Sequence, residues 1–244
     1  MANFVILGAY GGIGSALARQ LTAEGHRILL AGRDADRLQQ LGDELQMPTE
    51  HAEATDSATV EAAIAAGAEQ LSGLDGVANC FGSLLLKPGH VTTDAEFEQV
   101  LAVNLKSALA TVRGAVKAMP QGGSVVLVSS AAARIGLVNH EAIAAAKAGV
   151  EGLALSAAAT YANKRIRFNC VAPGLTETPM TARIIGTEAM AKASLKMLAL
   201  GRFGKAEEIA RAIAFLLDPA QSWITGQVLR VDGGLSSVWS RGNA

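Results

Sequence analysis

The chain has 244 residues and a mass of 25.0 kDa, which is enough for one large domain with its own core and does not require a second. Hydrophobic residues make up 50% and charged residues 18%, the balance of a compact α/β protein and not of a disordered chain. A net charge of −1 argues against broad electrostatic binding to nucleic acid or to an anionic membrane, so small molecules are the expected partners.

The N-terminal sequence MANFVILGAYGG has no basic segment before its apolar run and reaches glycines too early for a signal peptide. No uncharged apolar stretch of about 18 residues occurs, so we expect a cytoplasmic protein without a membrane span. The two cysteines, Cys80 and Cys170, lie far apart, with no CxxC pair and no histidine cluster around them. This spacing predicts buried free thiols and no metal site.

Short apolar runs alternate with longer amphipathic segments along almost the whole chain, which is typical of βαβ units on a parallel sheet. Seven runs are predicted strands: residues 3–8, 27–32, 49–54, 76–81, 124–130, 166–173 and 226–232. With helices between them, they predict an α/β Rossmann fold. Its doubly wound seven-stranded parallel sheet would carry helices on both faces, and one domain would span residues 1–244.

The first predicted helix follows the first strand, with Ile13, Leu17 and Leu21 four residues apart and Gly25 as its stop. Further helices are predicted near residues 34–46, 57–71, 93–118, 140–162 and 205–217.

Between Pro179 and Lys205 the periodicity weakens, and Met180, Met190 and Met197 are spread through the segment. The segment is either a mobile lid over a substrate or a set of ordinary core-facing helices with methionine as filler.

The stretch GAYGGIG, Gly8 to Gly14, comes directly after the first strand and opens the first helix. Glycines suit this position because the backbone must turn tightly and approach a diphosphate, which then binds the free N–H groups of the helix start. A purely structural turn, or another Rossmann-like class such as a methyltransferase, would show a similar pattern.

The end of the second strand carries Gly32 and Arg33, where a carboxylate would bind the ribose hydroxyls of NAD. Because a guanidinium pairs well with phosphate, Arg33 favours the 2′-phosphate of NADP over NAD. The alternative is a solvated charge, and the neighbouring Asp34 would partly oppose a bound phosphate.

Taken in order, the glycine turn, GVANCFG, VLAVNLKS, VVLVSS, Lys147, IRFNCVAPGLTETPM and ITGQVLRVDGG resemble the short-chain dehydrogenase/reductase family over nearly the whole chain. Within the family the chain looks most like the ketoacyl-carrier-protein reductases and small alcohol dehydrogenases. The resemblance implies hydride transfer between NADP(H) and a carbonyl or alcohol substrate.

The resemblance also implies which residues bind the cofactor. In the glycine motif Leu7 replaces the family's threonine, while Tyr10 and Gly11 stand where small polar and basic residues are common, so Arg33 would carry more of the NADP preference. The implied cofactor set is Gly8, Tyr10, Gly11, Gly12, Ile13, Gly14, Arg33, Glu53, Ala54, Asn79, Gly82, Lys147, Pro173, Gly174, Thr176 and Thr178.

The family's catalytic set is Asn, Ser, Tyr and Lys, and three members match Asn104, Ser130 and Lys147. The tyrosine position holds Ile143, thirteen residues after Ser130. In such enzymes the tyrosine protonates the alkoxide that hydride transfer creates, which isoleucine cannot do. Asn104 and Ser130 also have structural interpretations, as a helix-interior hydrogen bonder and a strand-end cap.

His140 is a candidate substitute acid, because it would share a helix face with Ile143 if the helix has begun there, and imidazole titrates near neutrality. Alternatively, His140 and Glu141 are only exposed first-turn residues. The other phenols fit less well, since Tyr161 lies at the far end of that helix and Tyr10 is expected to cover the adenosine half of the cofactor.

Two hypotheses follow: an NADP(H)-dependent oxidoreductase with an atypical active site, or a nucleotide-binding protein with little or no catalysis that acts as a sensor or partner subunit. The resemblance further implies a homo-oligomer, commonly a tetramer. The C-terminal residues 234–244 would extend that contact or fray.

Overall fold

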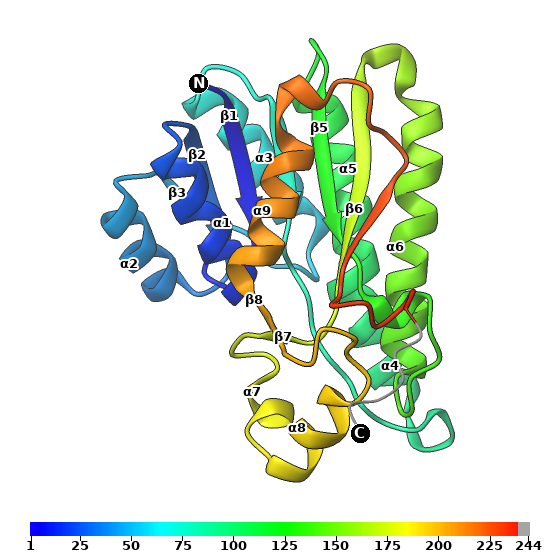
Figure 1. The fold of residues 1–244 in the computed structure, drawn as a ribbon. Helices are drawn as coiled ribbons and strands as arrows, with labels where there is room; N and C mark the ends of the chain where they lie inside the picture. The colour runs from blue at the N-terminus through cyan, green and yellow to red at the C-terminus, as the bar shows by residue number, and fades with distance from the viewer. Residues whose placement is uncertain (239–244) are drawn as a thin grey trace.

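A computed structural model describes residues 1–238 of the chain, and its central feature is a parallel sheet of seven strands (Figure 1). The strands are β1 (Asn3–Leu7), β2 (Arg27–Gly32), β3 (Thr49–His51), β4 (Gly76–Asn79), β5 (Gly123–Val128), β6 (Ile166–Pro173) and β9 (Val228–Val231). Their order in the sheet is β3-β2-β1-β4-β5-β6-β9. The chain adds β2 and β3 on one side of β1 and the later strands on the other side, as in a doubly wound sheet. The seven strands predicted from apolar runs are all confirmed, and so is the Rossmann fold.

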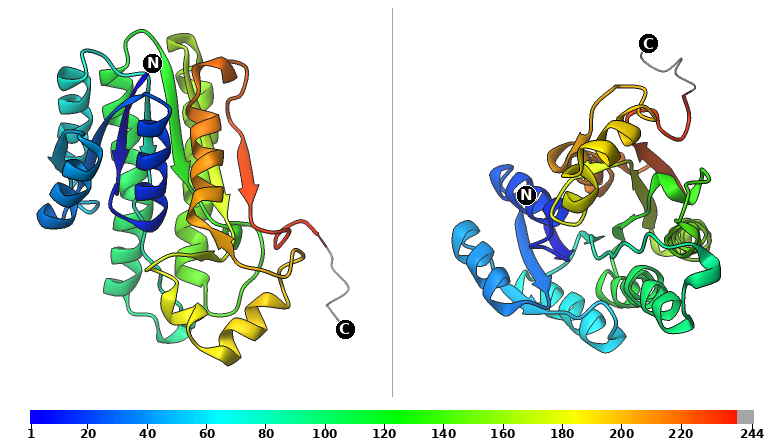
Figure 2. Two further views of the ribbon diagram at one scale, coloured as in Figure 1. Left: turned by 60° about the vertical axis from the view of Figure 1, so that its left-hand side comes forward. Right: turned by 90° about the horizontal axis from the view of Figure 1, so that it is seen from below.

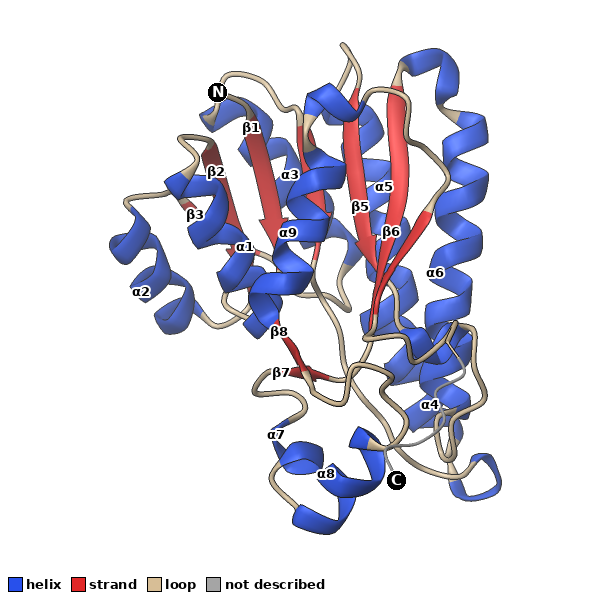
Figure 3. Cartoon of the chain, in the orientation of Figure 1, coloured by secondary structure: helices blue, strands red, loops and turns tan. Residues whose placement is uncertain are grey.

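Helices cover both faces of the sheet, as predicted (Figures 1 and 3). One face carries α1 (Gly12–Ala23), α2 (Ala35–Leu45) and α9 (Ala206–Leu217), and the other carries α3 (Ser57–Gln70), α5 (Ser107–Ala118) and α6 (Glu141–Thr160). Strand residues alternate between two apolar cores, with Phe4 and Ile6 in one and Val5 and Leu7 in the other. Gly25, at φ +80°, follows α1 as its predicted stop.

The helix α6 is long and apolar enough, by length and composition alone, to cross a membrane. It packs against β6, and its Val150, Ala154 and Ala157 belong to the apolar core on that face of the sheet. This packing is that of a core helix, which passes the same test of length and composition.

The single helix predicted at residues 93–118 is interrupted in the structure. It consists of α4 (Asp94–Leu101), a π-helical segment (Ala102–Lys106) and α5, so one extra residue enters the helical ladder around Asn104. Apolar periodicity cannot show such a bulge, because the sequence on either side keeps a helical pattern.

Residues 174–205 leave the sheet at its carboxyl edge and form a separate layer, seen mostly in yellow below the strands in Figure 1 and in the left view of Figure 2. The layer holds β7 (Thr176–Glu177) paired with β8 (Gly204–Lys205), and the short helices α7 (Ala182–Ile185) and α8 (Glu188–Leu195). Neither helix buries a residue, and Met180, Met190 and Met197 are each 44–50% exposed. The core-facing interpretation of this segment is therefore wrong.

Short 3-10 helices occupy Gly89–Val91 (η1), Ala131–Ala133 (η3), Ala162–Lys164 (η4) and Pro219–Gln221 (η5). At the C-terminus, the proposed contact segment 234–244 is only partly covered, because residues 239–244 lie outside the described residues.

Candidate functional site

The glycine turn lies between β1 and α1 at the carboxyl edge of the sheet. Gly8 has a φ of +73°, and a Cβ placed on it would lie 2.9 Å from the carbonyl carbon of Cys80. A Cβ on Gly14 would collide with the carbonyl oxygen of Gly8. The Gly11 N–H donates to the Gly8 carbonyl at 3.1 Å, but the helix start has no side-chain cap, so the N–H groups that follow in the first turn suit an anion such as a diphosphate.

Tyr10 does not point away from this turn but lies along the end of β2. A Cβ placed on Gly32 would be 2.5 Å from Tyr10 Cε1, so only glycine leaves room for the phenol ring there. The Tyr10 hydroxyl accepts a hydrogen bond from the Asp34 N–H at 3.3 Å. The Arg37 guanidinium sits 4.7 Å from the ring centroid and donates to the Tyr10 carbonyl at 3.2 Å.

Arg33 follows β2 directly and is mostly in solvent, with 71% of its side chain exposed. Its nearest ionic partner is Glu53, at 3.9 Å, a separation too long for a strong hydrogen bond. Asp34, which could oppose an anion, instead caps α2 by accepting from the Arg37 N–H at 3.1 Å. The end of β2 thus presents two guanidinium groups, of which the sequence pattern singled out only Arg33.

The acidic Glu53 and Ala54 lie just after β3, which is three residues shorter than predicted and ends at His51. Glu53 Oε1 accepts from the N–H and hydroxyl of Thr55, each at 3.3 Å, and Ala54 is buried. These bonds fix the loop beside Arg33, where an adenine is expected.

Asn79 ends β4 and is buried, and its side chain forms hydrogen bonds with neighbouring parts of the chain. Its amide donates to Thr111 Oγ1 at 2.9 Å, and its oxygen accepts from the Phe81 N–H at 2.9 Å. These bonds hold the Cys80–Gly82 segment over the glycine turn.

The segment after β6 closes over the glycine turn from the opposite side. Pro173 ends the strand, Gly174 packs against Asp232, and Thr176 Oγ1 donates to the Gly174 carbonyl at 3.0 Å. A Cβ placed on Gly12 would lie 2.8 Å from Thr178 Cγ2. The glycines therefore form a narrow cradle that a larger side chain would fill, and these residues fit an extended dinucleotide.

Lys147, Asn104 and Gly82 meet on the other side of the cradle. A Cβ placed on Gly82 would lie 3.6 Å from Asn104 Oδ1, 3.7 Å from Met180 Cε and 3.9 Å from Lys147 Nζ. Asn104 is buried in the π-helical bulge, where its amide donates to Val100 O and Ser83 Oγ, both at 2.9 Å. Three residues from distant parts of the chain and one methionine of the 174–205 layer thus share one point.

Lys147 is almost completely buried, and its Nζ donates to the Val128 carbonyl at 2.7 Å. Burial removes water from the ammonium and lowers the pKa of Lys147 from 10.5 to about 8. The ammonium is therefore close to losing its proton at the upper end of the physiological pH range.

The two serines at the end of β5 point to different neighbours. Ser130 Oγ accepts from the Ala132 N–H at 3.2 Å, so it caps the 3-10 helix η3 that follows the strand. The preceding Ser129 is buried and lies 3.1 Å from the Lys147 carbonyl and 2.9 Å from Glu151 Oε1. Ser129 therefore ties β5 to the helix of Lys147, a role that the sequence pattern did not indicate.

Ile143 lies one turn before Lys147 on α6 and is 3% exposed. It belongs to a small apolar cluster with Val100, Ala142 and Ala146, against which Leu84, Leu85 and Leu101 pack. Position 143 thus contributes an apolar wall to the region around Lys147.

His140 precedes α6 and is not part of it, because the helix begins at Glu141. The condition for a shared helix face with Ile143 is therefore not met. Its Nδ1 lies 2.7 Å from the Val138 carbonyl, and Glu141 Oε1 accepts from the Gly89 N–H at 3.2 Å. Tyr161 is at the far end of α6, against Phe168.

Both cysteines are free, as predicted, but only Cys170 is buried, whereas Cys80 is half-buried; desolvation raises the pKa of each thiol to about 12. Among residues 1–238, no group of three or more histidine, cysteine, aspartate or glutamate side chains is arranged to hold a metal ion.

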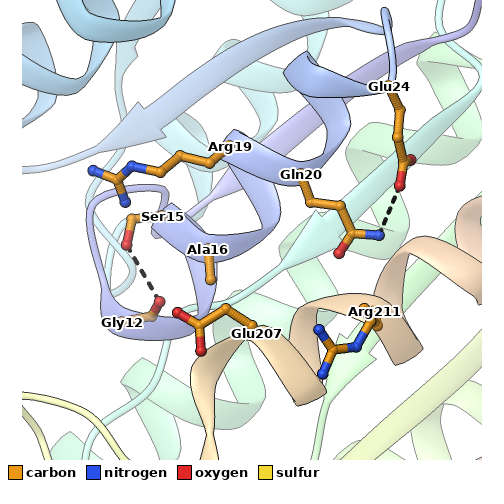
Figure 4. Close-up of a pocket in the computed structure, with 8 residues that line it drawn as sticks. All are labelled: Gly12, Ser15, Ala16, Arg19, Gln20, Glu24, Glu207 and Arg211. Atoms are coloured by element: carbon orange, nitrogen blue, oxygen red, sulfur yellow. Dashed lines mark hydrogen bonds between the residues drawn. The ribbon is translucent and has the colours of Figure 1, made fainter.

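A groove of about 520 Å³ lies between α1 and α9, on the outer side of the glycine turn (Figure 4). It shares only Gly12 with the cradle. Of its charged residues, Arg19 is bound to Glu44, and Glu24 accepts from Gln20. The groove is therefore separate from the point where Lys147 and Asn104 meet.

Comparison with known proteins gives matches along nearly the whole chain. A family model described as enoyl-(acyl carrier protein) reductase matches residues 8–236. A 3-oxoacyl-(acyl-carrier-protein) reductase of Rickettsia felis is 32% identical over 243 residues, covering 96% of each chain. A cis-4-hydroxycyclohexanecarboxylate dehydrogenase of Sinomonas cyclohexanicum is 35% identical over 243 residues, with the same coverage.

Solved structures match equally well. Levodione reductase has a TM-score of 0.90 at 31% identity, over 97% of this chain and 98% of the other. Actinorhodin polyketide ketoreductase, crystallised with NADPH, has a TM-score of 0.91 at 26% identity, over 97% of this chain and 98% of the other.

Proposed function

This chain belongs to the short-chain dehydrogenase/reductase family, and we propose that it transfers hydride between NADP(H) and a small carbonyl or alcohol substrate. The observation that carries the proposal is the convergence of Lys147, Asn104 and Gly82 beside an uncapped helix start lined with glycines. Its curated relatives include oxidoreductases that act on quite different carbonyl and alcohol compounds, so the substrate is proposed only as a class.

The cofactor would supply the hydride, and the residues of this chain would hold the reacting groups. In this proposal Ser130 orients the substrate oxygen, Lys147 binds the ribose on the nicotinamide side, and Asn104 supports a water relay from its place in the π-helical bulge. Gly8, Gly11, Gly12, Ile13 and Gly14 bind the diphosphate through the start of α1. Pro173, Gly174, Thr176 and Thr178 enclose the nicotinamide half, and Asn79 and Gly82 belong to the cofactor site through the Cys80–Gly82 segment.

NADP is the proposed cofactor because two guanidinium groups, Arg33 and Arg37, stand at the end of β2 where NAD-binding chains carry a carboxylate. Tyr10 would hold Arg37 in place and cover the adenosine half, while Glu53 and Ala54 bind the adenine. A related ketoreductase was crystallised with NADPH, which supports the same choice.

The site is proposed to be atypical, because Ile143 stands where the family's tyrosine acid would be. This supports a second candidate function: an NADP(H)-binding protein with little or no turnover, acting as a sensor or partner subunit. For both candidate functions we propose a single domain, a cytoplasmic location and a homo-oligomer, most commonly a tetramer in this family. The 174–205 layer would act as a lid over the substrate.

Two measurements separate these functions. Calorimetry with NADPH and NADH tests binding, and NADPH oxidation across a panel of aliphatic, cyclic and aromatic ketones tests turnover. Steady oxidation supports the enzyme. Tight NADPH binding without oxidation at any pH favours the second candidate, and no affinity for either nucleotide refutes both.

Replacing Ile143 with tyrosine tests the atypical site. Because a positioned acid contributes about 10²- to 10⁴-fold, Ile143→Tyr should raise the reduction rate sharply. Ile143→Phe is the matched control, since it brings the same ring into the apolar cluster without the hydroxyl. Equal rates for the two variants would contradict the acid role, and His140→Ala should then show whether the imidazole acts instead.

A further inference from the structure

A carbonyl reduced in this site needs a proton, and the described residues around Lys147 offer few donors. Ile143 has none, Tyr10 is held against Gly32, and Tyr161 packs on Phe168 at the other end of α6. His140 must donate its Nδ1 proton to the Val138 carbonyl, since a carbonyl can only accept. This contact engages the imidazole outside α6, which begins at Glu141.

Lys147 differs from these groups because its ammonium reaches the point where Gly82 and Asn104 meet. The Val128 carbonyl accepts one of its three protons, and Nζ lies 3.9 Å from a Cβ placed on Gly82. The remaining N–H groups are thus available on the side of the cradle.

The surroundings of Lys147 contain no strong counter-charge among the described residues. The titratable groups that act on it are the thiols of Cys170, on β6, and Cys80, after β4, and with a pKa of about 12 both are neutral at physiological pH. The remaining charged side chains of α6 and of the elements packed against it bind other groups or face solvent. Those that bind other groups are Glu151 to Ser129, Glu141 to Gly89, Glu96 to Lys87, Lys106 to Thr55, Arg113 and Lys117 to Glu61, and Arg167 to Ile224 and Asp218. Those that face solvent are Asp94, Glu98, Arg134, Lys164 and Arg165.

We propose that the Lys147 ammonium is itself the proton donor of this site and takes the place of the phenol that Ile143 lacks. The inference rests on the proposed function. The carbonyl carbon gains a hydride from the cofactor, its oxygen takes a proton from Lys147 Nζ, and the lysine is left as a neutral amine. A proton from water then restores the ammonium, while Asn104 holds the adjoining Ser83 segment in place.

A donor works best when its pKa lies near the operating pH. Burial gives Lys147 such a value, about 8, so the amine can both lose and regain a proton. Carbonyl reduction needs the protonated lysine and should fall about tenfold per pH unit above pH 8. Alcohol oxidation needs the neutral amine and should rise through the same range.

The test is a stopped-flow measurement of single-turnover NADPH oxidation between pH 6 and 10, at saturating NADPH so that cofactor binding does not limit the rate. Lys147→Arg keeps a cation but cannot release a proton, and we expect about a 100-fold loss or more. Lys147→Ala should lose as much and regain rate with added methylammonium. His140→Ala should keep both the rate and the pH profile of the unaltered chain.

A second readout does not depend on turnover. In protein carrying lysine labelled with ¹³C at Cε, NMR titration with NADP⁺ bound should show one lysine, absent in Lys147→Arg, that titrates close to pH 8. Titration of this signal above pH 9.5 would overturn the inference. So would a flat rate profile, a Lys147→Arg variant with an unchanged rate, or loss of the profile in His140→Ala. These results leave the proposed function standing, whereas no oxidation of NADPH by any variant refutes the function itself.

Discussion

Replacing Lys147 with methionine should remove a pH dependence from the stability of the folded chain. The folded-state pKa of Lys147 is about 8 and its ordinary value is 10.5, because burial disfavours the ammonium. Between these values the unfolded chain binds more protons than the folded chain, so the free energy of unfolding rises with pH there. Below pH 8 the full cost of burying the charge is present, and it amounts to about 3 kcal/mol.

The substitution also has an opposite effect. Methionine cannot donate to the Val128 carbonyl, which Nζ reaches at 2.7 Å, and an unpaired carbonyl costs about 1–3 kcal/mol. The two effects nearly cancel at pH 7, so the stability difference at one pH does not test the reasoning. Only the first effect changes with pH, and it should shrink by about 2–3 kcal/mol between pH 7 and pH 10.

Urea unfolding at a fixed protein concentration, at pH 7, 8, 9 and 10, measures this change. As the pH rises, the free energy of unfolding of the unaltered chain should increase relative to that of Lys147→Met. The control is Lys164→Met, which removes an exposed ammonium and tests the loss of a lysine as such. Other titrating groups cancel in the difference between variants. Parallel curves for the unaltered chain and Lys147→Met would show that the ammonium is not buried as described.

Two further substitutions test the cofactor cradle. Arg37→Gln should weaken NADPH binding by about tenfold and leave NADH binding nearly unchanged, because a guanidinium recognises the 2′-phosphate that NADH lacks; equal effects on the two nucleotides in calorimetry would contradict this. Gly14→Ala should lower the melting temperature and abolish NADPH binding, because the added Cβ meets the Gly8 carbonyl. The control Gly136→Ala, where nothing lies within 4 Å of the added Cβ, should change neither. A thermal scan with and without NADPH compares the two variants.

Much of the fold follows directly from the sequence. Each of the seven predicted segments forms a strand, and the strands buried on both faces, such as β1 and β5, are continuous apolar runs, whereas the edge strands β3 and β9 are only partly buried. The strand predicted at residues 49–54 stops at His51, because β3 is an edge strand that pairs only with β2. The bulge at Asn104 was not predicted, since the residues on both sides keep a helical pattern and one added residue only shifts the phase of the apolar face.

The candidate site shows the same division between local pattern and tertiary contact. Residue type and spacing selected Ser130, but its neighbour Ser129 makes the contact with α6, because consecutive residues of extended chain point to opposite sides. Arg37 was not selected because its contact with Tyr10 needs the glycine turn and α2 to meet. Likewise, the His140 hypothesis depended on where α6 begins, a boundary that patterns place only within a few residues.

Ile143 and Lys147 are best understood together. In the proposed site an isoleucine stands where the family's tyrosine would be, and its cluster with Val100 and Ala146 keeps this part of α6 apolar. An apolar environment is also what lowers the pKa of a buried lysine. In the proposed reaction, the residue that supplies no acid thus lies in the same apolar part of α6 as the buried lysine that would act instead. In Ile143→Tyr the added hydroxyl would donate the proton in place of the lysine, so its rate gain should come with a weaker dependence on Lys147.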